Sequence, residues 1–580
     1  MVQTISQTLP PTGVVEYATS RPRVLGWLRS AAILDGDWGT SIAYVLGIAF
    51  TLAGNSSLWH LMAMLALTSL VAVNYITICR LYPNGGGVYS SVQHRSRTLA
   101  VIGALLLGAD YVITMALSIL DACHYFGLEH PAIWAIAIIM MVAVLNWYGP
   151  KHSGGVALGI SFVTLLTLAV IIFASAPTSL RSVHVEPFHE SFVQNWGIFV
   201  GIILSISGIE AISNMTGLMK DPARDSRRAV SLVLAKVIFA TVFLGLAMHA
   251  IPGLTGHTED MVRFLGEHYV GDWFGWVVAV SLGLLLISAG NTAMNDLISI
   301  QFLMAVDKEL PIVLRKLNRF GVPVIPLFVS AVAPIAVLLV INDVLTLAQL
   351  YAIGVVGAIL INVGATGTDS TLSLSKPIRV MMIVSAVVLF FIEASIAVEK
   401  PKAAIFAAIV LVTGLGARYV AQRRPAPVPA PTAAVPVPVR KRTRKALPTT
   451  KFLLAMKDRS DRLLSFAIEE SKARNAFLFV LRVKEIAVGT LPERLEMSTN
   501  GEEKHIAEVC ANAGIDFQVI SIPSNEVGYT IVEQAATFGV ERIIIGATQR
   551  TRLENVFKGS VMKSVGQFLP EEIQLVIFGG

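Results

Sequence analysis

The sequence predicts an all-α polytopic membrane domain followed by a separate α/β domain. Of the 580 residues, 54% are apolar and only 14% are charged, whereas soluble domains carry roughly a quarter charged residues. Apolar runs of about twenty residues, the length that crosses a bilayer, recur as far as residue 420. After that point, short β-type runs alternate with stretches of helical periodicity, which indicates a parallel sheet.

Twelve apolar runs divide the first part of the chain, and we interpret each as one membrane span. They cover approximately residues 31–53, 58–80, 99–121, 131–149, 154–176, 196–214, 229–252, 272–296, 323–341, 344–364, 375–393 and 401–420. The predicted organisation is therefore an N-terminal segment at 1–30 and a twelve-span domain at 31–420.

Basic residues gather in every other connection between these runs. They include Arg21, Arg23, Arg29, Arg80, Arg95, Arg97, Lys151, Lys220, Arg224, Arg227, Arg228, Lys308, Arg315, Lys316 and Arg319. By the positive-inside rule, both ends of the membrane domain are cytoplasmic, in a multi-pass protein of the cell membrane. Because the positive charge follows topology in this way, we expect no nucleic-acid partner. The three cysteines lie far apart, so no disulfide framework or zinc site is predicted.

Residues 421–450 form a linker of different composition. The stretch "PAPVPAPTAAVPVPV" is expected to be extended and semi-rigid, and "RKRTRK" follows it at 440–445. This basic cluster either binds anionic lipid headgroups or is a solvated stop signal on the cytoplasmic side. The runs "KFLLAM", "AFLFVLRV", "DFQVISI", "RIIIGA" and "IQLVIFG" then predict the strands of a cytoplasmic α/β domain at 451–580.

The first apolar run contains its least lipid-soluble residues near its middle, in "LDGDWGTSIAY". A charged side chain at this depth costs several kcal/mol unless it faces an interior cavity. Asp37 is flanked by Gly36 and Gly39, which weaken the helix and let the backbone open. Broken helices of this kind build midplane binding sites in transporters with inverted repeats.

Polar residues recur on one face in three further runs. In the third run, Asp110, Thr114 and Ser118 are spaced by four, with Tyr111 beside Asp110. The sixth run contains Ser207, Gly208, Glu210 and Asn214, and the tenth run contains Tyr351.

The acids in these runs have no Lys or Arg in the same stretches. The group formed by Asp37, Asp110 and Glu210 is therefore either net negative, protonated or occupied by a cation. A set of oxygen ligands suits a hard cation. The alternative is that each acid is structural and caps a broken helix. Four other acids lie nearer predicted helix ends or lack hydroxyl groups on the same face, and we assign them no role: Asp35, Asp121, Asp296 and Glu393.

Two stretches, "LNWYGPKHSG" and "GIEAISNMTGLMKDPARDSRRAV", resemble the amino acid–polyamine–organocation superfamily. This resemblance implies a LeuT-type fold, in which spans one to five and six to ten form inverted repeats. "GDWGTSIAY" also resembles the "GDIGTSPLY" stretch of Kup-type potassium transporters, apart from its tryptophan and the absence of a proline. The whole set is similar to KimA-type proton-coupled potassium importers, which carry a cytoplasmic universal-stress-protein-like domain.

The resemblance implies a role for each matching residue. The cation ligands would be Asp37, Tyr44, Asp110, Tyr111, Thr114, Ser118 and Tyr351. Glu210 is the candidate proton carrier, because an apolar setting favours a protonated carboxyl group. Gly36, Gly39 and Gly208 would supply the opened backbone.

The C-terminal part resembles universal stress protein domains. Their nucleotide loop corresponds to Gly546, Gln549, Gly559 and Ser560, with Gln549 where the family has a second glycine. Lys457 and Asp458 stand where the family often has an Asp that binds adenosine. By this resemblance the regulatory ligand would be cyclic di-AMP or ATP, and the domain would form a homodimer. A dimerising module without a ligand is the alternative.

The sequence therefore predicts a K⁺/H⁺ symporter in the lipid bilayer that is not an enzyme and requires no cofactor. An amino-acid or polyamine permease is the second interpretation, because the superfamily patterns suit both. The carboxylate of Asp37 would repel the carboxylate of a zwitterionic substrate, so Asp37 disfavours an amino acid. It does not disfavour a polyamine. A membrane sensor that no longer transports is a third interpretation, and the intact acids and hydroxyls disfavour it.

Overall fold

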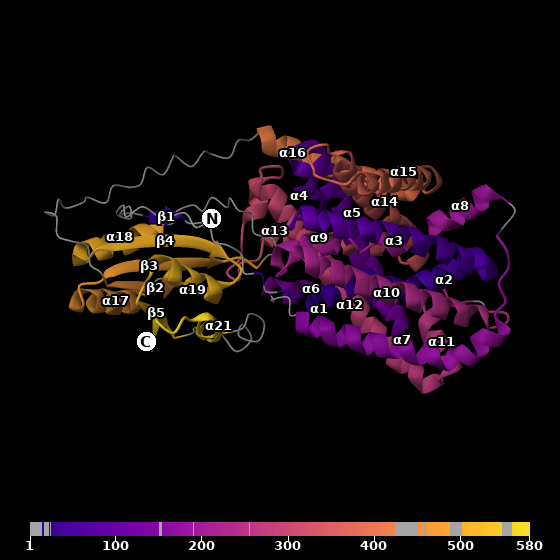
Figure 1. The fold of residues 1–580 in the computed structure, drawn as a ribbon, viewed down its shortest axis with the longest axis horizontal. Helices are drawn as coiled ribbons and strands as arrows, with labels where there is room; N and C mark the ends of the chain where they lie inside the picture. The colour runs from indigo at the N-terminus through magenta and orange to yellow at the C-terminus, as the bar shows by residue number, and fades with distance from the viewer. Residues whose placement is uncertain are drawn as a thin grey trace.

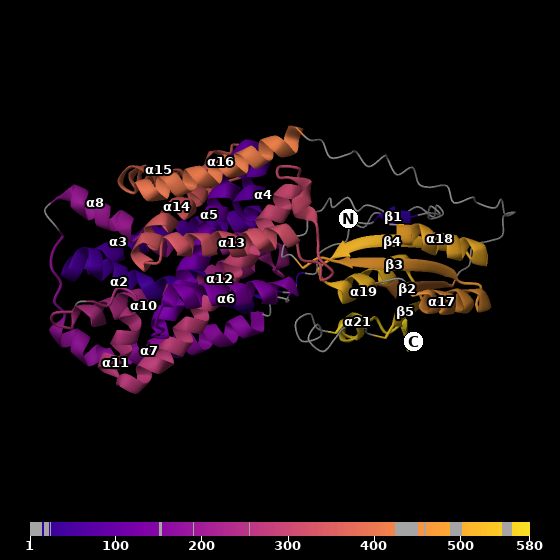
Figure 2. The same cartoon turned by 180° about the vertical axis from the view of Figure 1, so that it is seen from behind.

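The computed structural model of the protein describes residues 14–16, 23, 25–149, 154–188, 191–254, 256–423, 450–457, 460–487, 501–547 and 560–579. It has two parts, a bundle of helices and a six-stranded sheet with helices on its faces (Figures 1 and 2). We call the end of the bundle next to the sheet the sheet side, and the opposite end the far side.

The bundle contains long helices, broken helices and short connecting helices. In chain order they are α1 (Trp27–Asp35), α2 (Ser41–Ala53), α3 (Ser57–Leu81), α4 (Gly87–Gln93), α5 (Arg97–Tyr125), α6 (Pro131–Trp147), α7 (Gly154–Ser182), α8 (Phe192–Gly201), α9 (Ala211–Met215), α10 (Pro222–His249), α11 (Met261–Tyr269), α12 (Asp272–Val306), α13 (Val324–Val340), α14 (Val344–Thr368), α15 (Lys376–Glu399) and α16 (Pro401–Arg423). The central helix is α5, which packs against both α12 and α14.

Every predicted apolar run coincides with a helix or with two helices joined at a break. By length and composition, eight helical segments of the described chain can cross a membrane, or nine if the bent pair Phe192–Gly201 and Ile203–Leu218 is one span. The helices α6 and α13 are apolar but shorter. Trp38–Leu81 counts as one segment, although a turn at Gly54–Ser56 separates α2 from α3. The count of twelve spans therefore stays a prediction.

Two helices break where the sequence places polar residues inside apolar runs. Between α1 and α2 the chain forms a 3₁₀ turn at Trp38–Thr40, and between α8 and α9 it forms another at Ile203–Ile206. Gly208 lies in the second break with φ +89, a left-handed conformation that glycine adopts without strain. A Cβ atom at Gly208 would overlap the backbone of Trp38, so the two breaks pack directly on each other.

The sheet is entirely parallel, as predicted, with strand order β1-β4-β3-β2-β5-β6. Its strands are β1 (Val14–Glu16), β2 (Lys451–Met456), β3 (Phe477–Glu485), β4 (Phe517–Ser524), β5 (Arg542–Gly546) and β6 (Gln574–Phe578). The helices α17 (Asp461–Ala473), α18 (Gly501–Ala513), α19 (Val527–Phe538) and α21 (Val561–Phe568) accompany them. Separate apolar clusters cover the two faces.

One strand of this sheet comes from the other end of the chain. The sequence predicts only a cytoplasmic segment at 1–30, but Val14–Glu16 forms β1 and pairs with β4, Val14 opposite Val519. Three residues are too few to produce a recognisable β pattern, so this strand could not be predicted. The soluble sheet is thus built from both ends of the chain.

The sheet contacts the bundle at the carboxyl end of β3. Ile486 is fully buried among side chains of the membrane domain. The backbone N–H of Ala487 donates to the carbonyl of Gly321 at 2.9 Å, in the connection between α12 and α13. A Cβ atom at Gly149 would overlap Ala487. The carboxyl ends of the strands, where parallel sheets bind their ligands, therefore face the bundle (Figure 2).

We predict that Ile486→Asp separates the sheet from the bundle, because it places a charge in an apolar contact. Amide hydrogen exchange in residues 312–323 should rise in the full-length protein. Ile577→Asp is the matched control, since Ile577 is 51% exposed on the edge strand β6. Unchanged exchange in residues 312–323 of the Ile486→Asp protein would contradict this description of the contact.

Candidate functional site

The candidate site lies where the two broken helices meet in the middle of the bundle. Asp37 precedes the 3₁₀ turn of the first break, and Glu210 precedes α9 at the second. The indole N–H of Trp38 donates to the carbonyl of Ser205 at 3.3 Å. This hydrogen bond, together with the close approach at Gly208, holds the two breaks in one arrangement.

Three carboxyl groups are buried at this junction. Asp37 is 5% exposed, Asp110 on α5 is 1% exposed and Glu210 is 3% exposed. They lie near enough to one another to repel electrostatically when ionised. Among the residues that the structure describes, none of the three forms an ion pair, and no hydrogen-bond donor reaches Asp110 Oδ2 or Glu210 Oε2. The carboxyl groups of Asp110 and Glu210 are close enough to share a hydrogen bond when one of them is protonated.

Glu210 has two different oxygen environments. The backbone N–H of Gly208 donates to its Oε1 at 3.1 Å, whereas Oε2 is the atom without a partner. The left-handed glycine therefore turns its N–H group toward the carboxylate that follows it. One oxygen is fixed in position and the other is available to a proton or a cation.

Hydroxyl groups from three helical segments surround Asp110. Tyr351 of α14 donates to the Ser207 hydroxyl, which in turn donates to Asp110 Oδ1 at 3.5 Å. Thr114 donates to the Asp110 carbonyl at 2.9 Å, which leaves its lone pairs as acceptors. The structure thus places the Tyr351 hydroxyl one hydrogen-bonded hydroxyl away from Asp110.

The remaining predicted ligands, Tyr44, Tyr111 and Ser118, are also buried. Tyr44 lies within electrostatic range of Asp37 and Asp110. Ser118 is one helical turn beyond Thr114 on α5. Tyr111 lies toward the sheet side, where its hydroxyl accepts a hydrogen bond from Asn214 at 2.7 Å.

The glycines of the first break act differently from our expectation. The helix does end there, but Gly36 has right-handed backbone angles of φ −63 and ψ −17. A Cβ atom at Gly39 would overlap the carboxylate of Asp35. Gly39 therefore supplies space for a buried side chain, and of the three predicted glycines only Gly208 has a positive φ.

Asp35 occupies a second buried position, close to the first break. The Nζ atom of Lys236 on α10 lies 2.7 Å from each of its carboxylate oxygens, and the hydroxyl of Ser161 on α7 also donates to it. From the sequence alone Asp35 has no assigned role, and the patterns above do not single out Lys236. The signal was present, because a lysine inside the seventh apolar run requires an acidic partner.

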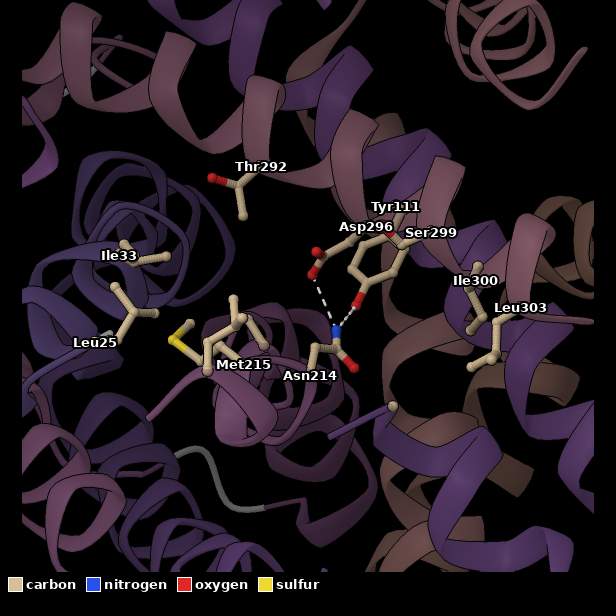
Figure 3. Close-up of a pocket in the computed structure, with 13 residues that line it drawn as sticks. Leu25, Ile33, Tyr111, Asn214, Met215, Thr292, Asp296, Ser299, Ile300 and Leu303 are labelled. Atoms are coloured by element: carbon tan, nitrogen blue, oxygen red, sulfur yellow. Dashed lines mark hydrogen bonds between the residues drawn. The ribbon is translucent and has the colours of Figure 1, made fainter. Parts of the chain in front are cut away.

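A cavity of about 80 Å³ lies on the sheet side of the junction. Figure 3 shows Asn214 between Tyr111 and Asp296, with its amide 2.9 Å from Asp296 Oδ2. Thr292, Asp296 and Ser299 project from one face of α12 into the same space. Asp296 lies at the end of a predicted span and is given no role there, but the helix continues to Val306.

The far side of the junction is closed by a loop. The Thr258 hydroxyl lies 2.7 Å from that of Thr51 on α2. The backbone carbonyl oxygen of Thr258 also lies so close to Gly47 that a Cβ atom on Gly47 would overlap it. The molecule is therefore hollow toward the sheet side and packed toward the far side.

The predicted nucleotide loop is only partly within the described residues. Gly546 ends β5, and the Ser560 hydroxyl accepts a hydrogen bond from the Lys563 N–H at 3.3 Å at the start of α21. Gln549 and Gly559 lie outside the described residues. The same is true of Asp458 and of the basic stretch at 440–445.

A broken-helix bundle with acids at its breaks defines a membrane transport protein, and comparison with known families agrees. Residues 25–420 match the profile of the amino acid permease family. The chain belongs to this family, so it is a transporter and not an enzyme. Residues 449–567 match the universal stress protein family, consistent with the parallel sheet.

Individual relatives carry different substrates. The chain is 24% identical to the potassium transporter KimA of Bacillus subtilis over 358 residues, 57% of this chain and 58% of that protein. It is 25% identical to the probable potassium transport system protein Kup of Myxococcus xanthus, over 37% of this chain and 38% of that one. It is 24% identical to the lysine-specific permease LysP of Escherichia coli, over 34% and 46%. Each match spans less than two thirds of the relative's length.

We predict that Lys236→Met lowers the free energy of unfolding by roughly 3–5 kcal/mol, because it leaves Asp35 charged and unpaired in the interior. The double variant Asp35→Asn/Lys236→Met should recover most of this loss. Thermal unfolding of the purified proteins measures both effects. A double variant as unstable as Lys236→Met would show that Lys236 stabilises the fold by packing rather than by pairing.

Proposed function

We propose that this protein carries potassium ions into the cell together with protons. The observation that supports this proposal is the group of three buried carboxyl groups at the facing helix breaks, which have no basic partner among the described residues. Three ionised carboxylates in the membrane interior would be very costly. Cations and protons from solution are the partners that would neutralise them.

The chemistry of the surrounding atoms favours a hard cation. Carboxylate, hydroxyl and carbonyl oxygens are available around Asp110, and K⁺ prefers such ligands to nitrogen or sulfur. One K⁺ ion neutralises one of the three charges, so protons are required for the rest. This balance of charges favours transport of K⁺ together with protons. Glu210 is the proposed proton carrier, because one of its oxygens is fixed by Gly208 and the other is unpartnered.

The proposed mechanism is alternating access in a LeuT-type arrangement of two five-helix repeats. The far side is packed and the sheet side is hollow, which corresponds to an inward-facing state if the sheet side is cytoplasmic. The positive-inside rule supports that orientation, since Arg97 begins α5 and Arg315 precedes α13 at the sheet side. Both termini are then cytoplasmic.

The second candidate function is transport of an amino acid or a polyamine, which the family and the LysP relative favour. Asp37 at the first break disfavours a zwitterion, because amino-acid carriers of this fold commonly bind the substrate carboxylate there. A polyamine would be attracted by the three acids. A sensor without transport does not explain why these acids are buried with no basic partner among the described residues.

We predict that the protein restores growth at low potassium in cells that lack potassium uptake and takes up ⁸⁶Rb⁺. Asp37→Asn and Asp110→Asn should each reduce uptake more than about tenfold, since each removes a charged cation ligand. Glu393→Gln is the matched control. Glu393 is a partly buried carboxyl group that also has an unpartnered oxygen, but it lies on α15 beside Gly357 of α14 and not at the helix breaks.

The result that contradicts the potassium proposal is specific. The parent protein would reach the membrane and fail to restore growth, yet take up labelled putrescine or lysine. Equal loss of ⁸⁶Rb⁺ uptake in the Glu393→Gln control would show that the buried acids act through stability.

We also propose that a nucleotide, cyclic di-AMP or ATP, binds the soluble domain and regulates transport, and that the soluble domain forms a homodimer. The direct contact of Ala487 with Gly321 supports a regulatory role, because it joins the edge of the sheet at the carboxyl ends of the strands, where parallel sheets bind ligands, to the connection before α13.

We predict that calorimetry of the full-length protein in detergent detects binding of one of these nucleotides. The full chain is needed because β1 belongs to the sheet. No heat with either ligand would leave dimerisation as the proposed role of the domain.

A further inference from the structure

Asp121 is a buried acidic residue in the half of α5 nearer the far side. Its side chain is fully buried, and neither carboxylate oxygen has a hydrogen-bond partner among the described residues. A carboxyl group in this setting is destabilising unless something outside the chain satisfies it. The neighbouring acids Glu259 and Asp260 do not share this feature, because both are partly exposed and bonded.

The position of Asp121 continues the row of oxygen groups on α5. Asp110, Thr114, Ser118 and Asp121 are separated by four, four and three residues, so they lie on one face of the helix. With a rise of about 1.5 Å per residue, the row extends about 16 Å from the central acids toward the far side. Tyr44 of α2 is buried and lies within electrostatic range of Asp37 and Asp110 and also of Asp121.

The surroundings of Asp121 are acidic and contain no ion pair to it. Glu259 and Asp260, in the loop that closes the far side, are close enough to act on it electrostatically. Among the described residues, no basic side chain there pairs with Asp121. His124 pairs through Nδ1 with Glu259 at 2.9 Å, while its Nε2 atom has no hydrogen-bond partner. Arg263 bonds Glu267 and the carbonyl of Tyr125, each at 2.9 Å.

We propose that Asp121 forms an outer site for the transported monovalent cation, beneath the loop at 256–260 and near Tyr44. The proposal rests on the proposed potassium transport for its substrate. A cation arriving from the far side is attracted by the half-exposed acids of the loop, pauses at Asp121 and passes inward along α5. The two orphaned oxygens are its ligands.

The competing explanation is that Asp121 is simply protonated, and one substitution separates the two. Asparagine has the shape of a protonated aspartate and no charge. If Asp121 binds the cation, Asp121→Asn raises the KM for ⁸⁶Rb⁺ uptake about tenfold and changes the rate at saturation by less than about twofold. Glu393→Gln is the control and leaves KM unchanged. An unchanged KM in the Asp121→Asn protein overturns the proposal.

A second measurement tests binding without transport. Equilibrium binding of ⁸⁶Rb⁺ to the purified full-length protein should give one ion fewer in Asp121→Asn than in the parent. The double variant Asp37→Asn/Asp110→Asn should retain the outer ion. Asp121→Glu keeps the charge and is expected to keep that ion, so a loss as large as in Asp121→Asn would assign the effect to packing and overturn the proposal.

The two proposals fail in different ways. If the parent takes up no ⁸⁶Rb⁺ but Asp121→Asn still loses a bound ion, potassium transport is wrong and the outer cation site stands. If the parent transports ⁸⁶Rb⁺ while binding and KM are the same in Asp121→Asn, the transport proposal stands and the outer site is wrong.

Discussion

The structure of the membrane domain depends on one electrostatic constraint, which is the burial of three carboxyl groups that have no basic partner in the part of the chain that the structure describes. Asp37 and Glu210 lie at the helix breaks, and Asp110 lies beside hydroxyl groups. Backbone N–H groups freed by a break offer what a regular helix cannot, as Gly208 does for Glu210. The close packing of Gly208 on Trp38 then makes the two breaks a single unit.

The same bundle buries another acid, Asp35, together with a basic partner. Asp35 lies only two residues before Asp37, but Lys236 neutralises it with two short contacts and Ser161 donates a further hydrogen bond. A pair of this kind is satisfied within the protein and needs no ligand. The three central acids lack such a partner among the described residues, and this difference separates a structural acid from one that is available to a transported ion.

The central acids could be predicted from the sequence because the cost of a charge in the membrane interior is local and large. Asp37, Asp110 and Glu210 stand out in apolar runs whatever the fold. The partners of the other acids could not be predicted, because they depend on contacts between distant segments. Lys236 and its partner Asp35 are 201 residues apart in the sequence, and Asn214 and its partner Asp296 are 82 residues apart. The docking of Ile486 and the pairing of β1 with β4 depend on the placement of whole domains, which periodicity does not encode.

The central claim is that the junction of the two breaks holds a potassium-sized cation. Anomalous scattering from crystals of the protein grown with Tl⁺ in place of K⁺ tests it directly, because Tl⁺ is similar in size and scatters strongly. We predict a peak within ligand distance of Asp37 and Asp110 that is lost in the Asp37→Asn/Asp110→Asn protein. A junction without any Tl⁺ peak in the parent protein, in crystals where Tl⁺ is bound elsewhere, would contradict the claim.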